Sequence, residues 1–270
     1  MLRFPNCKIN LGLYVTNRRA DGFHDLETVF YPVGWTDVLE ALPAKAGVDS
    51  SMTITGRSVD GKQDENLVWR AFQLLKAAFP GQVFPLEMHL HKVLPMGAGL
   101  GGGSADGAFA LQLINDVCRL GLSTAELSVF ALRLGSDCPF FLLNQPAFAA
   151  GRGEALEPLA IDLSRYTIQI ICPGIHVSTA AAFRGITPAP PGFDLRLLPR
   201  LPVSEWRGQV ENVFEKTVFA IHPEIASIKA ELYEQGALYA SMSGSGSAVF
   251  GIFEKGHNAA VEGYEQFLQA

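Results

Sequence analysis

The sequence predicts an α+β fold for its 270 residues. Segments with a hydrophobic period of two, typical of strands, lie between segments with a period near 3.6, typical of helices. The two kinds of segment do not follow the regular strand–helix–strand order of a doubly wound parallel sheet. A hydrophobic content of 48% is ample for a core, and the length fits one large domain or two small ones.

Strands are predicted in both halves of the chain. The first two are rich in Val, Leu, Phe and Tyr, and the polar turn between them favours a hairpin. In residues 86–91, apolar side chains alternate with Glu and His, as in a half-buried strand. The segments predicted as strands, one of them with a turn at 147–158, are 9–15, 28–35, 51–55, 86–91, 147–158, 167–172 and 247–253.

Helices are predicted where apolar residues recur every three or four positions. Pro80 and Gly81 end the first helix, and Ser123 with Glu126 forms a capping box at the start of the third. Five of the sixteen prolines fall in residues 186–202, which predicts an irregular loop. The predicted helices are 64–79, 104–119, 123–134, 209–220, 223–235 and 257–268.

The charge and the cysteines exclude several classes of protein. The net charge is -6, the sequence pI is near 5.5, and no block of like charge supports a nucleic-acid partner. The four cysteines lack metal-ligand spacing and are expected to be small buried thiols in a reducing compartment. Without a signal-peptide core or an apolar stretch of membrane-spanning length, we expect a cytoplasmic protein with no membrane partner.

The most informative segment is glycine-rich and runs from Lys92 to Asp106. Five glycines fall within residues 97–103, between a predicted strand and a predicted helix. Glycine lets the backbone turn through positive φ and leaves no Cβ to keep a ligand away. A loop of this kind at a helix start directs several N–H groups at an anion. The segment therefore predicts a phosphate-binding loop.

Three common phosphate loops fit this segment poorly. The G-x-G-x-x-G spacing from Gly97 to Gly102 matches the dinucleotide fingerprint, but a second helix follows its helix where that fold needs a strand. The protein-kinase glycine loop has the same spacing, but H-R-D and D-F-G are absent. The Walker pattern needs Gly-Lys-Ser/Thr, and the Gly-Lys pair at 61–62 precedes a glutamine.

A longer pattern, Pro95-x-Gly-x-Gly-Leu-Gly-Gly-Gly-Ser104, resembles the glycine motif of the kinases that act on galactose, homoserine, mevalonate and phosphomevalonate. Residues 241–250 resemble that superfamily's C-terminal glycine motif, a second small-residue loop near the phosphates, and residues 5–11 resemble its N-terminal motif. Three motifs in the right order make the resemblance specific. It implies a two-domain small-molecule kinase fold with the active site in the cleft between the domains.

Within this superfamily the chain resembles the family of 4-diphosphocytidyl-2-C-methyl-D-erythritol kinases. The matching segments are 7–13, 19–28, 101–106, 135–141, 151–154 and Asn212-x-x-Glu215. That family phosphorylates the 2-hydroxyl of its substrate from ATP, in the non-mevalonate route to isoprenoid precursors. The resemblance therefore implies ATP and a cytidyl-diphosphate small molecule as partners, with Mg²⁺ arriving with ATP.

A few positions depart from the family pattern. Phe23 stands where Tyr is usual, so the ring is kept and a hydroxyl is lost. Ala105 replaces a frequent Ser, which removes one possible contact to phosphate or metal. Cys7 and Ser136 stand where Ala is common, and Gly107 replaces a frequent Ala.

The resemblance implies that ATP binds the glycine loop, and it supplies two candidate catalytic residues, Asp137 and Lys8. Asp137 fits the base that phosphoryl transfer needs, or alternatively the N-cap of the helix that follows it. Lys8 would keep that carboxylate ionised and polarise the acceptor hydroxyl, or alternatively is a lysine at a sheet edge. The implied ATP-binding residues are Pro95, Met96, Gly97, Ala98, Gly99, Leu100, Gly101, Gly102, Gly103, Ser104 and Ala105.

Four residues are implied as substrate contacts. Phe23 and His24 would contact the cytosine, Asn10 would face the acceptor, and Phe183 would supply a second aromatic ring. The alternatives are a core aromatic residue for Phe23, a solvated side chain for His24 and a core position for Phe183.

A composition shift near residues 155–165 predicts the boundary between the two domains, an ATP-binding and catalytic domain over residues 1–155 and a substrate-side domain over 156–270. Two other functions stay open. Another kinase of the superfamily should lack the tetrapeptide Asp21-Gly22-Phe23-His24, and a non-catalytic nucleotide-binding regulator would bind ATP without turnover.

Overall fold

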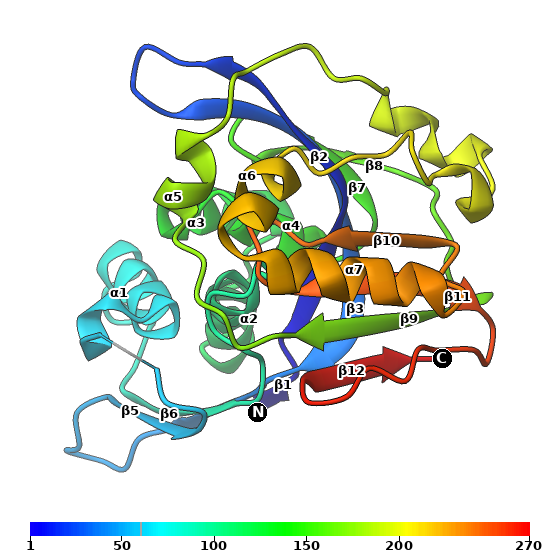
Figure 1. The fold of residues 1–270 in the computed structure, drawn as a ribbon. Helices are drawn as coiled ribbons and strands as arrows, with labels where there is room; N and C mark the ends of the chain where they lie inside the picture. The colour runs from blue at the N-terminus through cyan, green and yellow to red at the C-terminus, as the bar shows by residue number, and fades with distance from the viewer. Residues whose placement is uncertain (60) are drawn as a thin grey trace. The chain divides into compact units, whose positions relative to one another are not determined.

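The structure, a computed structural model (Figure 1), describes residues 1–59 and 61–270. It divides into two compact units. The first unit is Met1–Cys7, Gly34–Met96 and Gly101–Asn144, and the second is Lys8–Val33, Gly97–Leu100 and Gln145–Ala270. Each unit combines a sheet with helices, so the predicted α+β class is confirmed. The units do not follow the expected ranges 1–155 and 156–270, because part of the N-terminal half packs with the C-terminal half. The functional assignment of those ranges stays a prediction.

In the part of the first unit that the structure describes there are a four-stranded sheet, four α-helices and one 3₁₀ helix. Its elements are β1 (Leu2–Arg3), β4 (Val38–Pro43), β5 (Ser51–Gly56), a 3₁₀ helix (Gln63–Glu65), α1 (Leu67–Ala78), β6 (Leu86–Lys92), α2 (Gly102–Val117), α3 (Thr124–Leu134) and α4 (Cys138–Leu143). The strand order is β1-β4-β6-β5, with β5 parallel to β6 and the other pairs antiparallel. Helix α2 packs against the other three helices and forms the centre of this unit.

Local sequence signals set the helix ends of this unit. The Asn66 side chain accepts a hydrogen bond from the Val68 N–H at 2.9 Å and so caps α1. Ser123 and Glu126 make the predicted capping box of α3. Helix α2 begins at Gly102, two residues before the predicted start, so the last glycines of the loop belong to the helix.

The second unit contains two four-stranded sheets. Its elements are β2 (Asn6–Arg18), β3 (His24–Thr36), β7 (Ala147–Ala150), β8 (Ala155–Pro158), β9 (Tyr166–Cys172), α5 (Thr179–Arg184), 3₁₀ helices Leu195–Arg200 and Val203–Glu205, α6 (Phe214–Ile221), α7 (Pro223–Glu234), β10 (Tyr239–Met242), β11 (Val249–Glu254) and β12 (Glu265–Gln269). The ends of β2 and β3 at residues 6–7 and 34–36 belong to the first unit. The strand orders are β2-β3-β7-β8 and β10-β11-β9-β12. Helix α7 packs along β10 and β11 (Figure 1).

The predicted helix at 257–268 is wrong. The last residues of the chain form β12, which pairs antiparallel with β9 at the edge of its sheet. Ahead of it, Ala259 and Val261 are buried two positions apart, and Gly263 turns through a φ of 83°. This period of two and a left-handed turn favour extended chain over a helix. The prediction also missed β10 and began α6 five residues too early.

All four cysteines are buried, as predicted. Among the described residues, no helix combines the length and the apolar character that crossing a membrane requires.

Candidate active site

Residues 97–100 of the glycine loop pack against the C-terminal glycine-rich turn in the second unit. Ala248 donates its N–H to the carbonyl oxygen of Ala98 at 3.0 Å. Gly99 has a φ of +80°, and a Cβ at this position would overlap the carbonyl oxygen of Ser243. Glycine is needed where two backbones approach so closely. The two small-residue segments singled out from the sequence are therefore neighbours.

The following loop residues begin helix α2 in the first unit. Gly101, the N-cap, is left-handed with a φ of 73°. The first N–H groups of a helix have no acceptor inside it, and the helix dipole favours an anion beside them. Here those groups are on Gly102, Gly103 and Ser104, since Ala105 already donates to the Gly101 carbonyl at 2.9 Å. The backbone has the form of a phosphate site, and its use by ATP stays a prediction.

Other residues of the predicted ATP site serve in packing. Ala98, Leu100 and Ala105 have buried side chains, so only their backbone atoms could meet a nucleotide. Pro95 is half-buried, and the exposed Met96 lines a cavity that is described below.

Asp137 comes directly before α4 in the first unit. It occupies the N-cap position of that helix, as the alternative predicted, but its side chain makes no capping hydrogen bond there. Burial raises the pKa of the neighbouring Cys138 thiol to about 12, and a hydrogen bond with the Ser104 side chain opposes the rise. That bond joins the start of α4 to the start of α2. The candidate base therefore lies next to the predicted phosphate loop within this unit.

Lys8 lies in the second unit at the centre of a buried polar network. Lys8 lies on β2, an edge strand of its sheet as the alternative predicted, but the residue is only 3% exposed. The Nζ atom donates to Asn10 Oδ1 at 2.6 Å and to the Gly99 carbonyl at 3.1 Å, and it lies 5.0 Å from the centre of the Phe30 ring. Lys8 thus holds a glycine of the phosphate loop directly. Its pairing with Asp137 of the other unit stays a prediction.

The predicted substrate residues differ in burial: Asn10 is buried, His24 and Phe183 are half-buried, and Phe23 is exposed. Asn10 is 1% exposed and donates to Thr28 Oγ1 at 2.9 Å. The half-buried His24 stacks on the half-buried Phe183, with ring centroids 4.7 Å apart. Phe183 also packs edge-on against the core residue Phe214.

Phe23 is 55% exposed, which rules out the core alternative for this residue. The Arg152 guanidinium lies over one face of its ring, 5.1 Å from the centroid. An exposed ring with a cation on one face suits stacking with a flat ligand.

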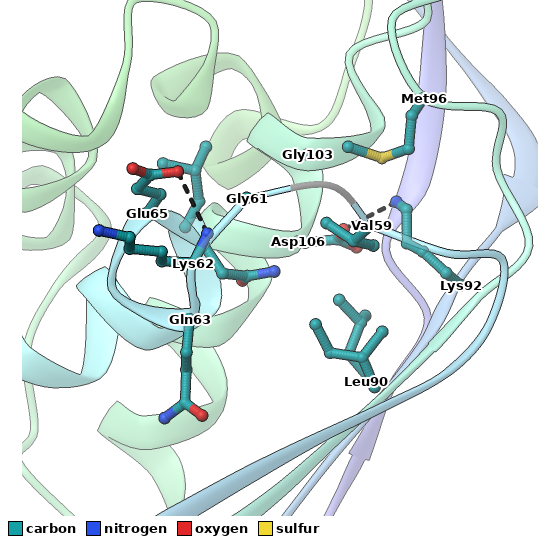
Figure 2. Close-up of a pocket in the computed structure, with 13 residues that line it drawn as sticks. Val59, Gly61, Lys62, Gln63, Glu65, Leu90, Lys92, Met96, Gly103 and Asp106 are labelled. Carbon is teal, nitrogen blue, oxygen red and sulfur yellow. Dashed lines mark hydrogen bonds and ion pairs between the residues drawn. The ribbon is translucent and has the colours of Figure 1, made fainter.

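A cavity of about 230 Å³ lies in the first unit beside the start of α2 (Figure 2). Gly103 and Asp106 line it from α2, and Lys92 lines it from the end of β6. Figure 2 shows Lys92, Asp106 and Gly103 around the same opening as Met96. The cavity is therefore continuous with the helix start that forms the second half of the glycine loop.

Lys92 makes two ion pairs, one with Asp37 and one with Asp106, the latter at 2.8 Å. Burial raises the pKa of Asp106 to about 8, with Lys92 opposing the rise and Asp37 adding to it. The buried Oδ1 of Asp106 has no hydrogen-bond partner within the described part of the chain. In that same part of the chain, no three His, Cys, Asp or Glu side chains are grouped as a metal site.

This cavity and the buried charges of Asp37, Lys92 and Asp106 beside it were not predicted from the sequence. Asp37 and Lys92 are 55 positions apart, so no local pattern joins them. The available signal was that Lys92 directly follows the half-buried strand predicted at 86–91 and continues its buried alternation, just before the glycine loop.

Replacement of Gly103 by valine is expected to weaken ATP binding. A Cβ at this position meets nothing within 4 Å and φ is not left-handed, so the fold accepts a side chain beside the cavity. The added volume should cost about 1–3 kcal/mol of ATP affinity. The matched control is Gly192→Val, because a Cβ at Gly192 would also have no other atom within 4 Å. Equal ATP affinities for the two variants in a binding titration would place ATP elsewhere.

Family models place the chain in a class of small-molecule kinases. The model of the GHMP kinases N terminal domain matches residues 66–152, and that of the GHMP kinases C terminal matches 194–267. The structure resembles homoserine kinase from Cytophaga hutchinsonii, with a TM-score of 0.66 and 18% identity over 98% of this chain and 94% of that chain. It also resembles the mevalonate kinase of Methanococcus jannaschii, with a TM-score of 0.70 and 10% identity over 99% and 97%. At such identities the likeness shows the fold alone. The chain belongs to the GHMP kinase family.

Relatives with higher sequence identity show which family within the GHMP kinases the chain belongs to. The 4-diphosphocytidyl-2-C-methyl-D-erythritol kinase of Parabacteroides distasonis is 50% identical over 94% of this chain and 92% of its own. That of Bacteroides thetaiotaomicron is 48% identical with the same coverage. A crystal structure of 4-(cytidine 5'-diphospho)-2C-methyl-D-erythritol kinase has a TM-score of 0.79 and 34% identity, and the match covers 93% of this chain and 90% of that chain. Within the GHMP kinases, the chain belongs to the 4-diphosphocytidyl-2-C-methyl-D-erythritol kinases.

Proposed function

We propose that this protein transfers the γ-phosphoryl group of ATP to the 2-hydroxyl of 4-diphosphocytidyl-2-C-methyl-D-erythritol, in the non-mevalonate route to isoprenoid precursors. The observation that carries the proposal is the 50% identity to a kinase of that name over 94% of this chain and 92% of the relative. In this reaction the hydroxyl oxygen bonds to the γ-phosphorus, the bond from that phosphorus to the bridging oxygen breaks, and ADP leaves.

The glycine loop and the cavity of the first unit are proposed to bind ATP. The N–H groups of Gly102, Gly103 and Ser104 suit phosphate oxygens, and the adjoining cavity offers room for the nucleoside. Mg²⁺ is expected to arrive with ATP and to be held mainly by phosphate oxygens, the hard ligands that this cation prefers.

Lys8 and Asp137 are proposed to act on the acceptor hydroxyl. The ammonium group of Lys8 supplies positive charge near the loop, which stabilises charge that develops on the transferred group. The Asp137 carboxylate orients the hydroxyl and takes its proton. An ionised aspartate is a weak base, so most of the rate gain comes from positioning and electrostatics.

The acceptor is proposed to be held by its cytosine, far from the reacting hydroxyl. Asn10 is assigned to the polyol end, next to Lys8, and Phe23, His24 and Phe183 are assigned to the cytosine end. Binding energy from the remote base would position the small polyol against the catalytic groups. Because His24 stacks on Phe183, the His24 ring already covers one face of the Phe183 ring.

Replacement of Phe23 by alanine is expected to raise the KM for the cytidyl acceptor and leave the KM for ATP unchanged. Loss of one stacking ring should cost roughly 1–3 kcal/mol, which is about 5- to 150-fold in KM. Stability should change little, because the ring is 55% exposed. Phe23→Tyr should be nearly neutral.

Phe4 offers a matched control for that variant, since its ring is 56% exposed. Phe4→Ala should leave both KM values unchanged. A rise in the KM for ATP in Phe23→Ala, or the same acceptor KM in both alanine variants, would place the cytosine elsewhere.

A phosphate-transfer assay with three acceptors side by side tests the proposed activity. We expect turnover with 4-diphosphocytidyl-2-C-methyl-D-erythritol and none with mevalonate or homoserine. Preferred turnover of either of the last two would favour another kinase of the superfamily. ATP binding without turnover of any acceptor would favour a nucleotide-binding regulator.

A further inference from the structure

Asn212 and Glu215 lie outside the residues assigned above to ATP or to the acceptor. We propose that their side chains clamp the turn at residues 242–246 and, through this turn, position Gly99 and Lys8 for phosphoryl transfer. This role rests on the function proposed above. It makes Asn212 and Glu215 positioning residues, because they act through other groups on the reacting atoms.

Asn212 holds the turn through two carbonyl groups. Its side-chain amide is buried and donates to the carbonyl oxygen of Met242 at 2.7 Å and to that of Gly244 at 2.8 Å. Its side-chain oxygen accepts the Phe214 N–H at 3.0 Å, so both ends of the amide are engaged. The backbone on either side is fixed to Leu13 of β2, through bonds of 2.8 and 2.9 Å. Asn212 therefore ties the turn to the strand that carries Lys8.

Glu215 holds the start of the same turn by accepting hydrogen bonds from it. Its Oε1 accepts the Met242 N–H at 2.9 Å and the Ser241 hydroxyl at 3.0 Å. Its Oε2 accepts Lys229 Nζ at 2.5 Å, which fixes the carboxylate. Met242 is thus held through its N–H by one side chain and through its carbonyl by the other.

The clamped turn meets the groups assigned to the reaction. Ser243 donates its hydroxyl to the Gly99 carbonyl at 2.9 Å, and the same carbonyl accepts Lys8 Nζ at 3.1 Å. The segment Ser243–Ser247 alternates serine with glycine, and such a chain has weak backbone preferences of its own. Its position therefore depends on the hydrogen bonds that reach it from outside. Misplacement of reacting groups by about 1 Å can cost about 10²-fold in rate.

Asn212→Asp tests the clamp with little change in shape. The new carboxylate keeps an acceptor for the Phe214 N–H but faces the carbonyl oxygens of Met242 and Gly244, which repel it. The matched control is Gln169→Glu, at another buried amide of the same unit, whose side chain both donates to and accepts from the backbone of Ala259.

We expect Asn212→Asp to lower kcat by about tenfold or more, with smaller changes in both KM values, at a temperature where both variants are folded. Hydrogen exchange of the amides at 242–246 should accelerate in this variant. Gln169→Glu should lose as much thermal stability without either change. If the two variants lost kcat equally, or if exchange at 242–246 stayed at its wild-type rate, the clamp would be overturned.

Glu215 supplies a second test that holds even if Asn212→Asp fails to fold. Glu215→Ala removes the acceptor for the Met242 N–H, whereas Glu215→Gln retains it. We expect the alanine variant to lose kcat and the glutamine variant to restore it to within a few fold of wild type. Wild-type kcat in the alanine variant would contradict the clamp. Failure of the proposed activity would appear separately, as no turnover by the wild-type protein, and the exchange measurement needs no acceptor.

Discussion

Asp137→Asn is expected to lower turnover by about 10²-fold or more, because an amide cannot take the acceptor proton and carries no charge. Stability should change by less than about 1 kcal/mol, since the Asp137 side chain makes no capping bond to α4 and is only half-buried. Steady-state turnover and a thermal melt of the same preparation measure both quantities.

Ser136, the residue before Asp137, provides a control for the Asp137→Asn variant. Ser136→Ala changes the same segment to the residue that is common in the family, and turnover should stay near the wild-type value. A folded Asp137→Asn protein with near-normal turnover would leave this aspartate outside the chemistry.

Lys8→Met is expected to have the second large effect. Methionine keeps most of the volume and removes the ammonium group, so turnover should fall by about 10²-fold or more. The Gly99 carbonyl and Asn10 Oδ1 also lose a buried donor, which should cost about 1–3 kcal/mol of stability. Turnover must therefore be compared at a temperature where the variant is folded.

Thr28→Val separates the charge of Lys8 from the integrity of its network. Thr28 is buried and bonds to Asn10 Nδ2 and to the Gly12 carbonyl, and the variant leaves the lysine in place. We expect a similar loss of stability with less than about a tenfold loss of turnover. Equal losses of turnover in the two variants would assign Lys8 a structural role only.

Much of the fold follows from local sequence signals. The hairpin of β2 and β3, the capping box at Ser123 and the alternation of β6 each depend on residues a few positions apart. The error at 257–268 has the opposite cause. The C-terminal end of that segment is extended because it pairs with β9, a strand about a hundred residues earlier in the chain. A short apolar run in the sequence does not indicate whether such a pairing strand exists.

The site shows the same division between local and distant causes. The glycine loop could be predicted because positive φ and a helix start are local properties. The contact of Gly99 with Ser243 joins residues 144 positions apart and was suggested only by resemblance to a kinase superfamily. The stacking of His24 on Phe183 and the burial of Lys92 between two aspartates are also long-range contacts, and no pattern in the chain specifies them.

The most direct test of the account is a ³¹P NMR spectrum of the product formed from ATP and 4-diphosphocytidyl-2-C-methyl-D-erythritol. Carbon 2 of the acceptor carries a methyl group and no hydrogen. A phosphate on the 2-hydroxyl must therefore give a new phosphomonoester resonance without three-bond coupling to hydrogen, and this is the expected result. A resonance split by neighbouring hydrogens would place the phosphate on a hydroxyl other than the 2-hydroxyl, and the absence of any new phosphomonoester would contradict the proposed activity itself.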